Sequence, residues 1–297
     1  MAKRSSVFIL SLILICTTVL IVWDIHRPGY FVTESPAILK RISYGFTIQN
    51  TSGHLVERAE LRVNAPRSES PTQRLQEIYS SHPHDVEYDS EGNAIFCYTF
   101  DSIPPHATRI ITLKADLLMR AVPLRGPNRE DESCLAEDRF IEVNDPHIRD
   151  LARSLNTGGS LITAEKIFHW IVKNIRYTSY VKNNRGALVT LLARQGDCTE
   201  MMHLFVALCR AAGVPVRCIA GYHSPEGGVL EPAQYHNWAE FYAEGRWWLC
   251  DPQRRVFMQE ADDYVALKII RHSPAARAFE FDRFHVAGAG MVGRMQY

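Results

Sequence analysis

The 297-residue sequence has no excess of charge of either sign. Lysine and arginine together number 33, and aspartate and glutamate together also number 33, so the formal net charge at pH 7 is zero. Proteins that bind nucleic acids usually present a basic surface, because the phosphate backbone is negatively charged. The balanced composition gives no electrostatic case for nucleic acid, and we expect no nucleic-acid partner.

Cysteine is present, but without the spacings of common cysteine sites. The seven cysteines are Cys16, Cys97, Cys134, Cys198, Cys209, Cys218 and Cys250. No two of them form a Cys-x-x-Cys pair, which argues against a structural zinc site or a thioredoxin-like motif. An even framework of disulfides is not evident either, so we interpret most of these residues as buried free thiols.

An uncharged apolar segment lies close to the N-terminus. Val7 to Trp23 comprises 17 positions, and as a helix it would span roughly 25 Å, the short end of what crosses a bilayer. Lys3 and Arg4 precede it and would stay in the cytoplasm, which sends the remaining chain outward. A cleavable signal peptide is the alternative, but no small-x-small pattern follows the segment, and Cys16 follows two bulky residues and makes a poor lipidation site. We therefore expect an uncleaved signal anchor in the membrane, with the rest of the chain periplasmic or at the cell surface.

Short stretches of alternating apolar and polar residues follow. The strand-like stretches are Ile42 to Ile48, Ala59 to Val63, Ile95 to Phe100 and Arg109 to Ala115. A period of two is typical of strands with one buried face, and turn residues such as Asp89 to Asn93 separate the stretches. The pattern predicts a small β-sandwich. His82, His84 and Asp85 lie close together beside a proline, and we interpret them as part of a solvated loop, not as a metal site.

The stretch with the clearest chemical signal reads Gly196-Asp197-Cys198-Thr199-Glu200. Apolar residues from Met201 onward then recur at helical spacing, and Gly213 lies where a helix would end. Cys198 therefore falls at the start of a helix, where unpaired N–H groups and the positive end of the helix dipole favour a reactive thiolate. Gly196 would let the backbone turn tightly and approach a substrate carbonyl. Taken alone, Cys198 is better explained as a small buried apolar residue that happens to lie near a helix start.

Two later stretches supply a histidine and an aspartate that can meet. These strand-like stretches are Tyr235 to Tyr242 and Arg246 to Asp251, with Glu244-Gly245 between them as a two-residue hairpin turn. With that turn, Tyr242 pairs with Trp247, and His236 lies on the same sheet face as Asp251, diagonally two residues away. Such positions are roughly 7 to 8 Å apart, within reach of an imidazole and a carboxylate. A slip of one residue would place the two side chains on opposite faces.

A thiol, an imidazole and a carboxylate arranged in this way can carry out thiol-dependent acyl transfer. His236 would take the proton from Cys198 and later return it to the leaving amine, while Asp251 fixes the tautomer of the imidazole. The same three residues could instead bind a metal, but nothing supplies a fourth ligand at a recognisable spacing. We therefore predict a catalytic triad that uses no metal and no cofactor.

Together these motifs resemble the core of the transglutaminase-like superfamily, and its bacterial, membrane-anchored members in particular. The matching stretches are Gly196 to Glu200 with the helix and turn through Arg217, His236 to Glu240, and Trp248 to Pro252, within about Arg139 to Phe257. The resemblance implies an α+β chain with a papain-like fold, Cys198 as nucleophile, His236 as general base and Asp251 as the orienting acid. It does not select a reaction, because the superfamily also holds proteases, amidases, peptide-N-glycanases and inactive scaffolds.

The chain then divides into four expected parts. They are a membrane anchor with its connector at 1–30, a β-sandwich-like domain at 31–120, a linker at 121–138 and a transglutaminase-like catalytic domain at 139–297. Helical periodicity predicts two helices, Pro146 to Leu155 and Thr163 to Ile175, before the Cys198 helix. We expect the loop from His223 to Gln234 to rim the cleft. The strand-like tail, Tyr264 to Ile270 and Phe279 to Val286, is expected to finish the sheet.

An acyl-transfer site also needs hydrogen-bond donors for the oxyanion of its tetrahedral intermediate. The backbone N–H of Cys198 is one candidate, and Gln195 and Tyr177 are candidates for the second donor. Asn237 and Trp238 follow the histidine in sequence. We expect these two side chains to shape the cleft and not to perform chemistry, and for Trp238 plain core packing is an equal alternative.

Two classes of function remain. The first is a membrane-anchored, extracytoplasmic cysteine enzyme that attacks an amide of a protein or peptide, forms a thioester at Cys198, and passes the acyl group to water or an amine. The second is a non-catalytic binding or scaffold protein of the same fold. The three triad residues together favour the enzyme, since a scaffold has no physical need for them. The choice between water and an amine depends on how well the cleft excludes water, which these motifs do not report.

Overall fold

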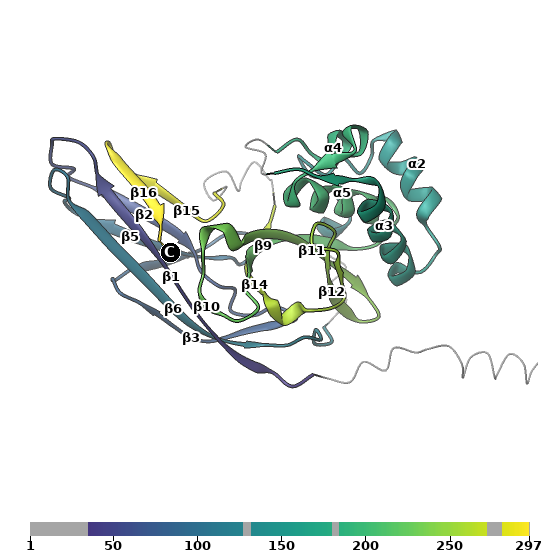
Figure 1. The fold of residues 1–297 in the computed structure, drawn as a ribbon, viewed down its shortest axis with the longest axis horizontal. Helices are drawn as coiled ribbons and strands as arrows, with labels where there is room; N and C mark the ends of the chain where they lie inside the picture. Colours follow the sequence, from purple (N-terminus) through teal and green to yellow (C-terminus); the bar gives the residue numbers. More distant parts are fainter. Residues whose placement is uncertain (1–34, 127–131, 180–183, 272–280, 297) are drawn as a thin grey trace, which may run out of the picture. The chain divides into compact units, whose positions relative to one another are not determined.

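The computed structural model describes residues 35–126, 132–179, 184–271 and 281–296, which belong to one compact unit that begins at Ser35. The apolar segment predicted as a membrane anchor lies outside the described residues. Among those that are described, no helix has both the length and the apolar character needed to cross a bilayer. Figure 1 shows two sheets at one side of this unit, the helices at the other, and a third sheet between them.

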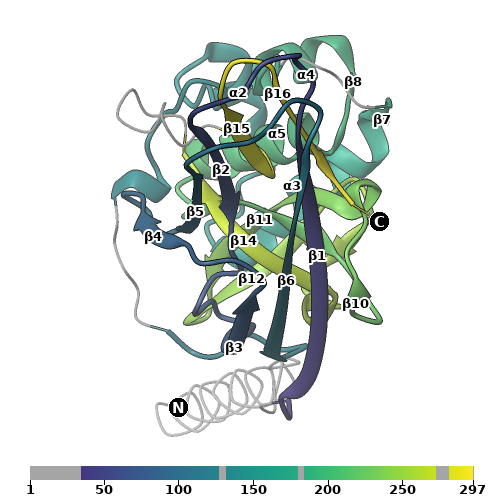
Figure 2. The ribbon, with the colours of Figure 1, turned by 90° about the vertical axis from the view of Figure 1, so that its left-hand side faces the viewer.

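Two sheets form the predicted β-sandwich. One has the order β10-β1-β6-β3, with β16 also pairing with β1, and the other has the order β15-β2-β5-β4. Their strands are β1 (Ile38–Asn50), β2 (Ala59–Asn64), β3 (Gln73–Ser80), β4 (Asp85–Tyr88), β5 (Ala94–Phe100), β6 (Thr108–Met119), β10 (Gly228–Val229), β15 (Phe284–Ala287) and β16 (Met291–Met295). Strands β1 and β6 run antiparallel for most of their length, side by side in the foreground of Figure 2. Their inward-facing residues alternate with outward-facing ones, and they share one apolar core with the facing sheet.

The third sheet is antiparallel throughout and has the order β13-β12-β11-β9-β14. Its strands are β9 (Val216–His223), β11 (Tyr235–Ala243), β12 (Arg246–Asp251), β13 (Val256–Phe257) and β14 (Tyr264–Ile270). The turn between β11 and β12 has positive φ at both Glu244 (56°) and Gly245 (78°), as a two-residue hairpin turn requires. Tyr242 pairs with Trp247, so the predicted register is confirmed.

Within the described residues, four helices lie against this sheet or beside it. They are α2 (Pro146–Leu155), α3 (Ser160–Asn174), α4 (Ala187–Ala193) and α5 (Cys198–Ala211). The two helices predicted before Cys198 are confirmed, and α5 begins at Cys198 and ends before Gly213, whose φ is +82°. Helix α5 packs on β11, where the rings of Phe205 and Phe241 meet edge to face at 6.2 Å. A short parallel pair, β7 (Arg176–Tyr177) with β8 (Gln195–Gly196), leads into α5.

The C-terminal tail returns to the sandwich. Strand β14 finishes the third sheet as predicted, but β15 pairs with β2 and β16 pairs with β1. The prediction that the segment reaching Val286 finishes the same sheet is therefore wrong. Met295 of β16 and Phe284 of β15 pack into the sandwich core instead.

Side chains of the sandwich cover the outer edge of β14. Gln73 donates to Ala266 O and accepts from Ala266 N, at 3.0 and 2.9 Å. Asn93 makes the same pair of bonds with Ile269, at 2.8 Å each. These amide side chains take the place of a neighbouring strand and satisfy an edge that would otherwise be unpaired. The sandwich thus contacts the third sheet directly.

A buried lysine ties the sandwich to the loop before His236. The Lys40 ammonium, on β1, is 5% exposed and donates to the backbone oxygens of Ser224 and Asp262, both at 2.6 Å. Burial lowers the pKa of Lys40, against the attraction of the nearby aspartates. Strand β10, within the same loop, pairs in parallel with β1. Residues of the sandwich therefore hold in place the loop between β9 and β11, which precedes His236.

Candidate active site

The first turn of α5 is capped on both sides, which fixes the position of Cys198. The side chain of Asp197 accepts from the Glu200 N–H at 3.1 Å, and the Glu200 side chain accepts from the Asp197 N–H at 3.2 Å. Arg185 donates to both oxygens of the buried Glu200 carboxylate at 2.6 and 2.7 Å. Cys198 is the first helical residue and is half-buried. Its thiol is held at a helix N-terminus, as the sequence predicts.

Gly196 is needed at this point because of space. A Cβ atom there would lie 2.9 Å from the Cβ of Glu200 and 3.1 Å from Cγ2 of Thr190. Gly196 is not among the residues with positive φ. Gly196 belongs to the short strand β8, and its absent side chain lets the capping carboxylate of Glu200 pack against the backbone.

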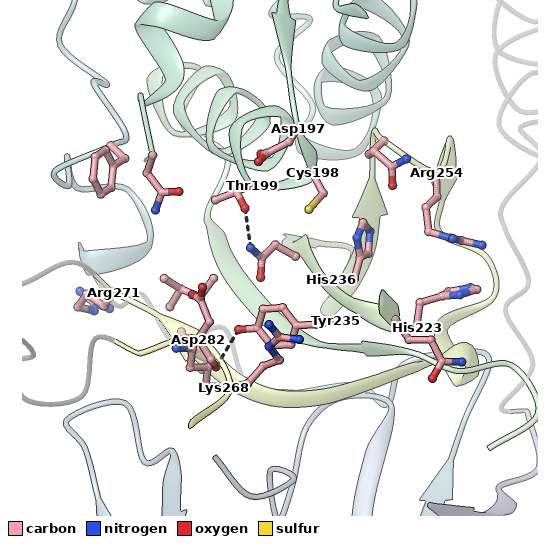
Figure 3. A pocket seen from close by; sticks show the side chains of 18 of the residues that line it. Asp197, Cys198, Thr199, His223, Tyr235, His236, Arg254, Lys268, Arg271 and Asp282 are labelled. Atoms are coloured by element: carbon pink, nitrogen blue, oxygen red, sulfur yellow. Dashed lines mark hydrogen bonds between the residues drawn. The ribbon is translucent and has the colours of Figure 1, made fainter. Parts of the chain in front are cut away.

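His236 and Asp251 form a close hydrogen bond across the β11–β12 hairpin. Nε2 of His236 lies 2.6 Å from Oδ2 of Asp251, and both side chains are buried. The imidazole also lies close enough to the Cys198 thiol for that group to help raise the pKa of His236. The three residues singled out in the sequence are thus brought together in the order thiol, imidazole, carboxylate (Figure 3 shows the thiol and the imidazole).

Two further donors hold the carboxylate of Asp251, which is 1% exposed. The Tyr264 hydroxyl donates to Oδ2 at 2.8 Å, and the backbone N–H of Arg254 donates to Oδ1 at 3.1 Å. Burial, followed by the proximity of Asp251, raises the pKa of Tyr264 well above its ordinary value, so this side chain stays a donor. A buried carboxylate with three donors is satisfied and oriented.

The pKa of His236 is raised above its ordinary value of 6.5. Burial acts to lower it, but the hydrogen bonds to Asp251 and Cys198 and the charges of these two groups outweigh burial and raise the pKa to about 9. At neutral pH the imidazole therefore favours its protonated form, which stabilises a neighbouring thiolate.

A cavity of about 1050 Å³ lies between the third sheet, the start of α5 and the sandwich, and Asp251 is buried behind it. Cys198 and His236 line it, and so do Tyr177 and Asn237. Pro225, Pro232, Ala233 and Gln234 of the expected rim loop also line it, which confirms the predicted place of that loop. The sandwich contributes Asp89, Ser90 and Glu91, and Glu91 pairs at 2.5 Å with Arg271, which also lines the cavity.

The two candidates for a second oxyanion donor differ in position. The half-exposed Tyr177 lies close enough to Cys198 and Asp197 that, after burial, their charges raise the pKa of its hydroxyl. Gln195 does not line the cavity, and its Oε1 accepts from Arg176 Nη2 at 2.6 Å. The structure therefore favours Tyr177 over Gln195.

Thiols other than Cys198 are buried in the described part of the chain, and none of them is in a disulfide there. Burial raises the pKa of Cys97 to about 11 and that of Cys218 to about 12. Thiols with such pKa values are poor nucleophiles at neutral pH. Among the described cysteines, Cys198 is thus the one whose surroundings suit a reactive thiol.

One group of side chains in the described residues has the spacing of metal ligands. Ligand atoms of His223, Glu260 and Asp263 lie within 4.8 Å of one another. The ammonium of Lys40 lies 3.7 Å from Asp263 and competes with a cation for that carboxylate.

His84 belongs to the group that the sequence predicted to lie in a solvated loop and not to bind a metal. In the structure its ring stacks on the ring of Phe96, with the two centroids 4.1 Å apart.

Comparison with known families shows which family the part of the chain around Cys198, His236 and Asp251 resembles. The family model described as the transglutaminase-like superfamily matches residues 149–252, a range that contains Cys198, His236 and Asp251. Residues 149–252 form a transglutaminase-like domain. Its sheet and its helices, with α5 leading from the cysteine, are the α+β arrangement that the motifs imply.

The similarity to one solved structure extends beyond the transglutaminase-like domain. A protein from Cytophaga hutchinsonii, provisionally described as a cysteine protease, has a TM-score of 0.60 at 19% identity and covers 89% of this chain and 92% of its own. The periplasmic domain of TgpA from Pseudomonas aeruginosa has a TM-score of 0.40 at 14% identity, over 74% of this chain and 94% of its own. An uncharacterized protein of Haemophilus influenzae is 44% identical over 62 residues, which is 20% of this chain and 17% of that relative. The first of these structures has a similar fold over 89% of this chain, a share that includes parts of both the sandwich and the transglutaminase-like domain.

Sequence reasoning missed several residues that hold the site. Tyr264, Glu200 with Arg185, and Lys40 all act on the triad or on its surroundings through side-chain bonds. The Asp197-x-x-Glu200 spacing is a capping-box signal that the sequence does carry. No local signal identifies Tyr264 or Lys40, because their partners are set by the register of distant strands.

Proposed function

We propose that this protein is a cysteine-dependent enzyme that attacks an amide carbonyl of a protein or peptide and forms a thioester at Cys198. The observation that carries the proposal is the alignment of the Cys198 thiol, the His236 imidazole and the Asp251 carboxylate, with 2.6 Å between the last two. Hydrolysis is the proposed outcome, with transfer to an amine as the alternative acceptor chemistry. The similarity to a protein described as a cysteine protease supports this choice.

Each residue has a role that follows from its geometry. His236 takes the proton of Cys198, and the thiolate attacks the carbonyl carbon, so that a negative charge develops on the carbonyl oxygen. The backbone N–H of Cys198 and the hydroxyl of Tyr177 are the proposed donors to this oxygen. His236 then gives its proton to the leaving amine, the C–N bond breaks, and the acyl group stays on sulfur as a thioester.

The second half of the reaction uses the same groups in reverse. His236 removes a proton from water or from an incoming amine, which attacks the thioester and releases the Cys198 thiol. Asp251 keeps the imidazole in one tautomer through both halves. The acid, the base and the nucleophile all come from the protein, so the proposed reaction requires no metal and no cofactor. Because Cys198 is half-exposed to a wide cavity, water has access to the thioester, which supports hydrolysis.

The test uses the purified full chain and two matched variants. A mixture of unrelated peptides, and separately a glutamine-containing peptide with a primary amine, would be incubated with each protein and analysed by mass spectrometry. We expect cleavage or deamidation by the wild type, none with Cys198→Ala, and wild-type rates with Cys97→Ala, which removes a buried thiol of the sandwich. Turnover that persists in Cys198→Ala would refute the triad. Wild-type inactivity together with an unreactive thiol would favour a binding or scaffold protein.

We also propose that the chain is anchored in a membrane by its N-terminal segment, with the transglutaminase-like domain outside the cytoplasm. The support is the uncharged run from Val7 to Trp23 after Lys3 and Arg4. Protease added to intact spheroplasts should digest the domain while a cytoplasmic marker survives. Protection of the domain until the cells are lysed would contradict this orientation.

A further inference from the structure

A hydrogen bond joins the two residues that directly follow the thiol and the imidazole. Nδ2 of Asn237, next to His236, lies 2.7 Å from Oγ1 of Thr199, next to Cys198. Figure 3 shows this bond beside the cysteine and the histidine. Thr199 belongs to α5 and Asn237 belongs to β11, so the bond crosses the boundary between the helix and the strand.

The placement of this bond follows from the geometry of the strand. Successive side chains of a strand point to opposite faces, so His236 points toward Asp251 while Asn237 points toward α5. One face of β11 thus holds the imidazole, and the adjacent residue fixes the same piece of backbone to the first turn of the helix. A shift of α5 relative to β11 would change the distance between sulfur and imidazole, and it would also break this bond.

The burial of Asn237 is costly for a residue with a purely structural role. Asn237 is 8% exposed, and its Oδ1 is fully buried without a hydrogen-bond partner among the described residues. A buried acceptor that loses its bond to water pays a desolvation penalty, which an apolar side chain of similar size avoids. Polar groups that lower stability in this way are typical of functional positions.

We propose that the Thr199–Asn237 hydrogen bond is a positioning brace that sets the separation of the Cys198 thiol and the His236 imidazole. This inference rests on the proposed function, because the brace positions the thiol and the imidazole that the proposed reaction uses. Neither Thr199 nor Asn237 exchanges protons or electrons in the reaction. Their effect is to hold the thiol and the imidazole at a fixed separation before substrate arrives.

The test measures the rate at which iodoacetamide alkylates Cys198 in the full chain at pH 6, with the modified residue located by mass spectrometry. Thr199→Val removes the hydroxyl at nearly constant volume, and Thr199→Ser keeps it. Asn237→Leu removes the amide. We expect Thr199→Val and Asn237→Leu to slow alkylation by about 10-fold or more, because a thiol that has lost its imidazolium partner is mostly protonated at pH 6. Thr199→Ser should stay close to wild type.

Two further readouts separate a brace from a structural role. The double variant Thr199→Val/Asn237→Leu should react no more slowly than the slower single variant, because both substitutions remove the same bond. The midpoint of thermal unfolding should not fall in Asn237→Leu, because the substitution also removes a buried unsatisfied oxygen. If the factors by which the two substitutions slow alkylation multiply in the double variant, the brace is overturned.

The possible failures are distinguishable. If wild-type Cys198 reacts at pH 6 as slowly as an ordinary thiol, the proposed function fails, and the brace fails with it. If the wild type reacts fast and Thr199→Val reacts equally fast, the proposed function stands and the brace is overturned. Because Thr199 is half-buried on the first helical turn, Thr199→Val remains decisive even if Asn237→Leu is unstable.

Discussion

Tyr264→Phe tests how much one hydrogen bond to the Asp251 carboxylate contributes. The substitution removes only the hydroxyl that donates to Oδ2 at 2.8 Å, while the ring keeps its edge-to-face contacts with Trp238 and His223 at 5.1 and 5.0 Å. A hydrogen bond to a charged, buried group is worth about 1.5–3 kcal/mol. For a unit of this size, 1 kcal/mol shifts the unfolding midpoint by roughly 2–4 °C, so we expect a loss of about 3–12 °C.

The same variant should also be slower as an enzyme, because the carboxylate that orients His236 gains freedom to rotate. We expect kcat to fall by about 10-fold with little change in KM, since Tyr264 is buried and does not line the cavity. Tyr222→Phe is the matched control: this tyrosine is equally buried, but its hydroxyl donates to the sulfur of Met295, a weak acceptor. Stability would be followed by calorimetry and activity by peptide turnover. Equal losses in the two variants, or none in Tyr264→Phe, would refute the assigned role.

Two further predictions follow from the site. The pKa of His236 is higher in the folded chain (about 9) than its ordinary value of 6.5, so its stabilisation is complete below pH 6.5 and is lost as pH rises through 9. Urea unfolding should show the free energy falling by on the order of 3 kcal/mol at most over this window, with a flatter profile in His236→Ala. Gly196→Ala should push Glu200 out of its capping position and lower stability by about 1–2 kcal/mol. Gly53→Ala, where a Cβ meets nothing within 4 Å, is its control, and a neutral Gly196→Ala would contradict the packing.

The parts of the site that could be predicted from the sequence depend on short-range rules. The period of two in β11 and β12, with a glycine at the turn, fixes which face carries His236 and Asp251. Helical spacing after Asp197 places Cys198 at the first turn of α5. In both cases neighbours in sequence determine the geometry, so the pattern alone is sufficient.

The parts that could not be predicted depend on contacts between distant segments. Gln73 and Asn93 pair with β14 through side-chain amides, and such pairs have no periodic signature. The pairing of β15 with β2 closes a sheet across more than half of the chain, and a strand-like pattern does not say which sheet it joins. Tyr264 reaches Asp251 only because β14 and β12 belong to the same sheet.

The central claim is that Cys198 and His236 form a thiolate–imidazolium pair, and the pH dependence of alkylation tests it most directly. Iodoacetamide would be applied to the full chain and to His236→Ala from pH 4 to 10, with Cys198 located by mass spectrometry. The account predicts fast modification of the wild type well below pH 8.5, about where an ordinary thiol titrates, and a shift toward that value in His236→Ala. Identical profiles that both rise near pH 8.5 would contradict the pair and the enzyme mechanism built on it.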